Sequence, residues 1–213
     1  MPQFTTKAKV EDYLAITINA ALDASVTAWI EAVSDYIEKF TGRFFTPPTN
    51  FETRTFDGNG NERLTVDDFI EIQKLVVDGV EISANDYFTY PANRLPKTAI
   101  ELKTGLARNS RQVITQSFYQ FTDGQQNVEV TAKFGYGAAV PAVIELAATK
   151  LVGGIIKESV GDKDIKELTS ETLGDYQASY VKVQDIAHAL GIEDLLKPFI
   201  KDDGRPSVGI ITL

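Results

Sequence analysis

Carboxylate and amide oxygens alternate along the segment Asp57-Gly58-Asn59-Gly60-Asn61, which is how the first ligands of a calcium-binding loop are spaced. Such a loop also requires glycine at its sixth position and a bidentate glutamate at its twelfth. Glu62 and Asp68 stand at those two positions instead. The same segment is typical of a tight turn between two strands, and we interpret it as a turn.

Two further glycine-rich segments lack the context that their chemistry needs. Gly58-Asn59-Gly60 has no third glycine at the spacing of a dinucleotide-binding turn, and no Walker A sequence occurs. Gly135-Tyr136-Gly137 has the letters of a potassium-channel filter, without flanking membrane helices. We expect this segment to mark the end of a strand that leads into a helix.

The residues that most often carry catalysis are scarce. His188 is the single histidine, cysteine is absent, and no G-x-S-x-G turn presents a serine nucleophile. Without cysteine, the chain has no disulfides, thiolate metal sites or cysteine nucleophile. Its 30 acidic residues will bring some carboxylates together by chance, so spacing alone nominates no acid–base pair. The sequence therefore predicts no catalytic residue, no metal site and no cofactor, and we expect no enzyme activity.

Charge and hydropathy narrow the class of protein further. The chain has 213 residues, with 21 basic and 30 acidic side chains and a formal net charge of −9. This balance disfavours a broad basic face for nucleic acid, because Lys and Arg contacts to phosphate supply most of that affinity. Pro141, Glu145 and Lys150 interrupt the most apolar stretch, residues 138–156, so we expect no membrane span.

Helices are expected near the start of the chain. Apolar residues spaced three and four apart predict one buried stripe, formed by Val26, Trp29, Ile30, Val33, Ile37 and Phe40. We expect the first four of these in the helical core, Asp23 as the N-cap and Gly42 as the terminating residue. A shorter helix is expected over Val10–Asn19. Two such helices cannot bury both stripes on each other, so they need further helices or another chain.

The middle third of the chain predicts a β module, because alternating, β-branched and aromatic residues recur between turn signals. The expected strands are Thr53–Phe56, Ile72–Val77, Val80–Ile82, Tyr87–Tyr90, Ala99–Lys103, Val113–Phe121 and Val128–Phe134. Asp78-Gly79 predicts a tight hairpin turn, since both residues readily take positive φ.

Helical spacing returns after Gly137. Pro141 suits the first turn of a helix running to about Lys157, with a stripe formed by Val143, Ile144, Ala147, Leu151 and Ile155. Gly153-Gly154 lies near its end and predicts either close packing or an early stop. A last short helix is expected over Ile192–Phe199.

Together these segments predict an α+β fold. Its helical body is built from N- and C-terminal segments, interrupted by a central antiparallel β module, with an extended C-terminal tail. The expected boundaries are residues 1–46 and 138–200 for the helical body, 47–137 for the β module, and 201–213 for the hinge and tail.

The tail differs in kind from the segments before it. A polar, breaker-rich hinge, Lys201–Pro206, precedes the apolar and β-prone Ser207–Leu213. Such a strand either pairs with the β module of its own chain or adds to a sheet edge on another subunit. The residues that we expect to bind a partner are Val208, Gly209, Ile210, Ile211, Thr212 and Leu213.

Four segments, read in order and spacing, resemble the head–tail connector (adaptor) proteins of tailed bacteriophages. They are Val10–Leu14 followed by the helix ending Tyr36–Phe45; Thr55–Gly58 with Val77–Val80 and Asp86–Pro91; Val128–Gly137 leading through Pro141; and Thr172–Tyr180 before a closing helix ending Leu195–Phe199. The resemblance covers most of residues 10–200, and the tail after Pro206 has no residue-by-residue match.

The resemblance implies a non-enzymatic virion protein of the head–tail interface, assembled in the host cytoplasm. Such proteins form a ring, typically of about twelve subunits, beneath the portal of a DNA-filled capsid. They extend the DNA channel and provide the platform on which the tail docks. The implied partners are further copies of the chain, the portal protein and a tail completion or tail terminator protein, with DNA passing non-specifically through the lumen and no membrane.

Two alternatives remain open from the sequence. The first is a tail or baseplate binding module of a phage, in which the β module recognises a partner and the helices support it. The second is an enzyme that uses a carboxylate pair, which a loss of activity traced to one Asp or Glu would reveal.

Overall fold

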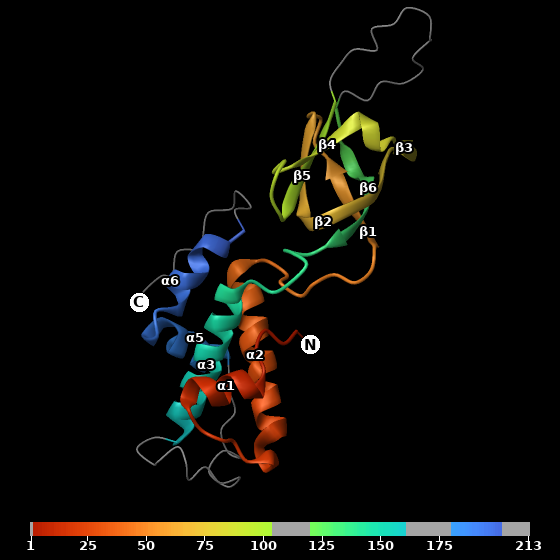
Figure 1. Ribbon diagram of the computed structural model, residues 1–213. Coiled ribbons are helices and arrows are strands. Elements are labelled where there is room, and N and C mark those ends of the chain that lie inside the picture. The colour runs from red at the N-terminus through yellow and green to blue at the C-terminus, as the bar shows by residue number, and fades with distance from the viewer. Residues whose placement is uncertain (1, 104–119, 161–179, 202–213) are drawn as a thin grey trace, which may run out of the picture. The chain divides into compact units, whose positions relative to one another are not determined.

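A computed structural model gives the structure of the chain and describes residues 2–103, 120–160 and 180–201. The chain divides into two compact units (Figure 1). The helical unit comprises Met1–Arg43 and Pro141–Leu213, and the sheet unit comprises Phe44–Val140. The chain passes from the helical unit to the sheet unit and back again. Helices together with an antiparallel sheet make the fold α+β, which confirms the predicted fold class.

The regular elements in the described part of the helical unit are α-helices of 5 to 19 residues and two 3₁₀ turns of three residues. They are α1 (Lys7–Leu14), the 3₁₀ turn η1 (Ala20–Leu22), α2 (Asp23–Thr41), α3 (Ala142–Val160), α5 (Tyr180–Ala189), α6 (Ile192–Leu196) and the 3₁₀ turn η4 (Lys197–Phe199). No helix in the described ranges is long and apolar enough to cross a membrane.

The long helix α2 carries the predicted apolar stripe. Val26, Trp29, Ile30 and Val33 are all buried, as expected for the helical core. Gly42 follows the last helical residue with a φ of +66°, in the left-handed region where glycine has no steric cost, so its terminating role is confirmed.

The predicted N-cap of α2 is wrong. Leu22, not Asp23, precedes the first helical residue, and no side chain caps that position. The turn η1 runs directly into α2, and Asn19 caps this turn by accepting from the N–H of Ala21 at 2.9 Å. The Asp23 carboxylate instead pairs with the Lys7 ammonium at 2.5 Å.

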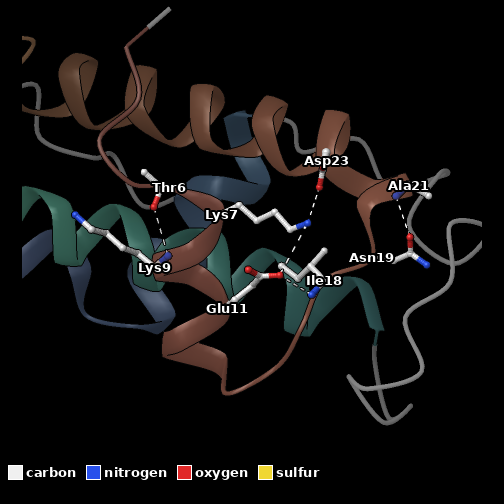
Figure 2. A network of polar contacts seen from close by, with 8 residues as sticks. All are labelled: Thr6, Lys7, Lys9, Glu11, Ile18, Asn19, Ala21 and Asp23. Atoms are coloured by element: carbon white, nitrogen blue, oxygen red, sulfur yellow. Dashed lines mark hydrogen bonds and ion pairs between the residues drawn. The ribbon is translucent and has the colours of Figure 1, made fainter.

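The first helix is shifted towards the N-terminus relative to the expected Val10–Asn19. Thr6 accepts from the N–H of Lys9 and starts α1 at Lys7, while Ala15 takes a left-handed conformation and ends it. Figure 2 shows Glu11 turned towards Ile18, whose N–H it accepts at 2.7 Å. The N–H groups of Ala15 and Ile16 donate to Asp12 O and Glu11 O, and this pair of hydrogen bonds closes the helix.

The central helix of this unit is α3, which packs against α1, α2, α5 and α6 (Figure 1). A helix that is apolar on most of its surface must be buried on most sides. Buried residues occupy nearly every turn, namely Ile144, Ala147, Ala148, Leu151, Val152, Ile155 and Ile156. The glycine pair allows close packing and does not stop the helix. A Cβ on Gly153 would lie 2.9 Å from the ring of Tyr13, and one on Gly154 would lie 2.7 Å from Ile186.

The C-terminal helices differ from the single short helix expected over Ile192–Phe199. Gly191, with a φ of +64°, separates α5 from α6, and a 3₁₀ turn replaces the end of the predicted helix. Pro198 lies in the first turn of η4, where a missing N–H costs nothing. The helix α5 was not among the predicted elements.

The described residues of the sheet unit form one sheet of six antiparallel strands. They are β1 (Glu52–Gly58), β2 (Arg63–Val77), β3 (Val80–Ile82), β4 (Tyr87–Tyr90), β5 (Lys97–Leu102) and β6 (Gly124–Phe134), with the 3₁₀ turn η2 (Ala84–Asp86) before β4. The strand order is β1-β6-β2-β5-β4, and β3 pairs with the end of β2. Most of the expected Val113–Phe121 strand lies outside the described residues.

The long strand β2 organises this sheet. Its first half pairs with β5 and its second half pairs with β6 and β3, with register shifts between them. Such bulges bend a strand and increase its twist. The bend lets one face of the sheet enclose a core of large side chains that includes Phe69, Leu75, Ile100, Leu102 and Phe121.

The predicted hairpin turn is confirmed. Asp78 and Gly79 connect β2 to β3 with φ values of +50° and +77°. Positive φ at both central residues is the mark of a type I′ turn, which matches the twist of the paired strands.

Candidate functional site

The Asp57–Asn61 segment uses its oxygens inside the fold. Asp57 accepts from the N–H of Gln126 at 2.7 Å, and Asn59 accepts from the N–H of Asn61 at 3.0 Å. In residues 2–103, 120–160 and 180–201, no three histidine or acidic side chains gather where they could hold a metal ion. The segment is a turn stabilised by side-chain to backbone hydrogen bonds, as the sequence predicts.

A polar junction beside this turn was not predicted from the sequence. The Asn127 side chain accepts from the N–H of Gly58 at 2.8 Å and donates to Thr122 O and to the Asp78 carboxylate at 2.9 and 3.1 Å. Two hydrogen bonds to the Asp78 carboxylate, the larger contribution from the Thr122 side chain and the smaller from Asn127, hold the pKa of Asp78 below its ordinary value. One amide thus ties the end of β1, the hairpin turn and the chain entering β6.

Gly58 fits this junction because it has no side chain. A Cβ at Gly58 would lie 1.8 Å from the carbonyl oxygen of Thr122, and backbone cannot give way by that amount. The signal in the sequence is the glycine itself, but its partner lies more than sixty residues away along the chain. We name Gly58, Asp78, Thr122 and Asn127 the amide junction.

His188 lies at the surface of the helical unit. Its side chain is 84% exposed, and Nδ1 lies 3.4 Å from Glu193. Glu193 also accepts from the Tyr36 hydroxyl at 3.4 Å. A neighbouring ion pair joins Asp194 and Lys197, and the hydrogen bond from Lys197 lowers the pKa of Asp194. These contacts connect α5 to α6 and α6 to the buried Tyr36 on α2.

Gly135-Tyr136-Gly137 leads β6 out of the sheet, as expected. The N–H of Gly135 donates to Asp68 O at 2.8 Å, and the N–H of Tyr136 donates to Phe44 O at 3.0 Å. A Cβ on Gly135 would lie 2.9 Å from the ring of Pro48. The glycine therefore lets the segment that follows β6 lie against the segment that precedes β1.

The two ends of the sheet order differ in chemistry. On β1, Arg54 bonds Asp67 at 2.9 Å and Glu52 at 3.2 Å, and its guanidinium lies 4.2 Å from the centre of the Phe134 ring. The strand β4 has the sequence Tyr-Phe-Thr-Tyr and carries no charge. Charged side chains on an edge strand disfavour pairing with another chain, and β1 carries them whereas β4 does not.

Aromatic side chains and cations meet on the outer face of β4. Phe88 is 52% exposed, and the Lys103 ammonium lies 4.5 Å from the centre of its ring. The Arg63 guanidinium lies 4.7 Å from the centre of the Tyr90 ring. Exposed aromatic residues beside basic ones are typical of protein interfaces. This edge, with Arg63, Tyr87–Tyr90 and Lys103, is the candidate functional site, and we name it the β4 edge.

The six predicted partner-binding residues, Val208–Leu213, lie outside the described residues. Their role stays a prediction. Sequence reasoning located β4 itself at the correct residues but did not identify it as an edge, because strand order is a property of the whole sheet.

Comparisons with known proteins identify the family. A family model described as head completion protein matches residues 3–166, which is more than half of the chain and includes all of the sheet unit. No curated protein matches. Among solved structures, the chain is similar to one from the neck of an empty gene transfer agent particle computed with C6 symmetry, with 16% identity and a TM-score of 0.48 over 95% of this chain and 91% of that one. By its match to the family model, the chain belongs to the head completion protein family and is a structural head–tail connector of the bacteriophage virion, located at the head–tail interface.

Proposed function

We propose that the chain forms a ring of about twelve subunits beneath the portal, where it extends the DNA channel and provides the platform on which the tail docks. The observation that carries this proposal is the family match over residues 3–166. A head is completed when its exit is extended and made ready for a tail, and a closed ring is the symmetric assembly that leaves an axial passage.

The helical unit offers a surface for packing between subunits. Val143 and Leu146 lie three residues apart on α3 and are 38% and 45% exposed. Apolar side chains at this spacing share one helix face, and the same helix is buried on most of its other sides. In the proposed ring, this face packs against the neighbouring subunit.

The charge of the chain suits a conduit for DNA. A formal net charge of −9 gives few sites at which phosphates would bind, so DNA passes through the lumen without sequence-specific contacts. In this proposal the protein acts through assembly and not through catalysis.

The C-terminal residues Val208–Leu213 extend the proposal to partners. We propose that this apolar segment leaves its own subunit across the hinge Lys201–Pro206 and pairs with a strand of the portal or of another subunit. The opposite face of the ring then meets the tail completion or tail terminator protein.

Co-sedimentation with purified DNA-filled heads that lack tails tests the proposal. The full-length chain and a version ending at Pro206 are compared, after circular dichroism has established that both are folded. We expect saturable binding by the full-length chain and weaker binding by the shorter version. If both are folded and neither binds, the connector ring is wrong and a tail or baseplate binding module becomes the better account.

A further inference from the structure

The backbone at the β4 edge is arranged to receive another strand. The N–H of Lys103 donates to Asp86 O at 2.8 Å, at the start of the β4–β5 ladder. Because hydrogen-bonded and non-hydrogen-bonded pairs alternate in an antiparallel ladder, Phe88 and Tyr90 direct their backbone groups towards β5. The backbone N–H and C=O groups of Tyr87 and Thr89 therefore point away from β5. In the described part of the chain, no strand pairs with that side of β4.

Both ends of this edge are fixed. The turn η2 leads into β4 and is capped by Ser83, which accepts from the N–H of Asn85 at 3.3 Å. After β4, the Lys97 ammonium donates to Pro91 O at 2.5 Å and to Ala92 O at 2.7 Å. An edge that is already ordered loses little conformational entropy when a partner strand binds.

The chemistry of the β4 edge matches one segment of the same sequence. Ser207–Leu213 is uncharged, apolar and β-prone, as β4 is. The segment before it contains Asp202 and Asp203, and the cations at the β4 edge are Lys103 and Arg63. The seven Cα–Cα steps from Lys201 to Val208 span at most about 25 Å, which is the reach available to the segment from the end of η4. The β1 edge offers no such match, since that strand carries the charged side chains of Glu52, Arg54 and Asp57.

We propose that the β4 edge of one copy binds residues Val208–Leu213 of a second copy as an added strand. The proposal rests on the proposed function, in which this segment is donated, and it names the surface that receives it. Backbone hydrogen bonds to Tyr87 and Thr89 supply affinity, and the outward aromatic rings of Phe88 and Tyr90 contact the apolar side chains of the added strand.

Proline substitution tests this geometry with a matched control. Thr89→Pro removes an N–H that points to the open side of β4 and leaves the β4–β5 ladder intact. Thr55→Pro makes the same change on the opposite edge strand. On β6, the backbone of Asn127 faces β2, because its carbonyl accepts from the N–H of Asp78. Backbone groups alternate in direction along a strand, so Val128 and Val130 face β1, where they pair with Phe56 and Arg54. The N–H of Thr55, which lies between these two residues, therefore points outward from the sheet.

The probe is a fluorescent peptide of residues Lys201–Leu213, titrated with the full-length chain and followed by fluorescence polarisation. We expect saturable binding, at least tenfold weaker for Thr89→Pro and unchanged for Thr55→Pro. Should Thr89→Pro fail to fold, Phe88→Ser serves instead, because this half-exposed ring is not part of the core, and it too is expected to weaken binding.

Three outcomes overturn the inference: no binding of the peptide, equal binding by all folded variants, or loss only in Thr55→Pro. Co-sedimentation with heads separates this failure from failure of the proposed function. If the chain binds heads through its C-terminal segment but does not bind the peptide, the proposed function stands and the segment binds the portal instead of the β4 edge.

Discussion

The helical unit and the sheet unit are held together in different ways. In the helical unit, α3 is enclosed by other helices, and its buried residues and glycine pair set how closely they approach. In the sheet unit, an apolar core is combined with the amide junction, where one side chain ties three backbone segments. The helical unit therefore depends most on side-chain volume around α3, with buried hydroxyls such as those of Thr5 and Thr149 bonded to each other at 2.7 Å, whereas the sheet unit depends also on a polar junction that fixes its turns.

This difference suits an assembly protein. A unit that depends on volume tolerates changes of surface polarity, so its outer faces can be adapted to neighbouring subunits. A sheet whose turns are fixed by hydrogen bonds presents its edges in one geometry, and a strand-binding edge requires that. The predictions below test this comparison.

The largest effect is expected from removing volume at the centre of the helical unit. Leu151 on α3 has no exposed surface, so Leu151→Ala leaves a cavity and lowers the free energy of unfolding by about 2–5 kcal/mol. The exposed Leu146 on the same helix is the matched control, and Leu146→Ala is expected to cost under about 1 kcal/mol. Urea denaturation measures both. Equal losses would show that α3 is not enclosed.

Adding volume to the amide junction is expected to cost somewhat less. In Gly58→Ala the new methyl would overlap Thr122 O, and the backbone shift that follows costs about 3 kcal/mol. Gly79→Ala is the control, because its Cβ meets nothing within 4 Å and only its positive φ is penalised, by about 1 kcal/mol. Thermal unfolding that ranks Gly79→Ala as the more destabilised variant would contradict the account of the junction.

Removing the junction amide tests the role of polar groups directly. Asn127→Ala leaves the N–H of Gly58 and the carbonyl of Thr122 without this partner, at a cost of about 1–3 kcal/mol. Asn85→Ala removes an exposed amide on η2 and is expected to change stability by less than about 0.5 kcal/mol. Chemical denaturation should give Asn127→Ala the lower midpoint. Similar midpoints would show that the amide junction adds little to the stability that the apolar core provides.

The smallest expected effect is a change in the stability of the folded chain at low pH. The pKa of Asp78 in the folded chain lies below the ordinary aspartate value of 3.8, because of hydrogen bonds from Thr122 and Asn127. The ionised carboxylate therefore stabilises the folded chain at pH values above that ordinary pKa, and this stabilisation is lost as the pH falls through the pKa of the folded state. Asp78→Asn keeps the turn geometry and removes the charge. Its urea midpoint should fall less than that of the parent chain between pH 6 and pH 3, and parallel curves would contradict this.

Local patterns predicted much of the fold. The stripe of α2, the Asp78-Gly79 turn and the residues of β4 follow from spacing and turn chemistry within a few neighbouring residues. The early end of α1 could not be predicted, because the helix ends at Ala15 in a left-handed conformation, which alanine rarely adopts. The amide junction was likewise hidden, since Gly58 and Asn127 meet only when β1 pairs with β6.

The candidate site divides along the same line. The apolar and β-prone residues in Ser207–Leu213 predict a strand that binds a partner, and this prediction needs only the sequence. Which edge is open to a strand depends on the order β1-β6-β2-β5-β4, which no local pattern encodes. The ion pair of Arg54 on β1 with Asp67 on β2 likewise depends on the strand order, because β6 lies between these two strands.

The central claim is that this head completion protein forms a ring on the head. The most direct measurement is the number of full-length chains bound per DNA-filled head without a tail, determined by quantitative co-sedimentation over a range of protein concentrations. The account predicts saturation at about twelve copies per head, as for one closed ring. Binding that never saturates, or no binding by a folded chain, would contradict it.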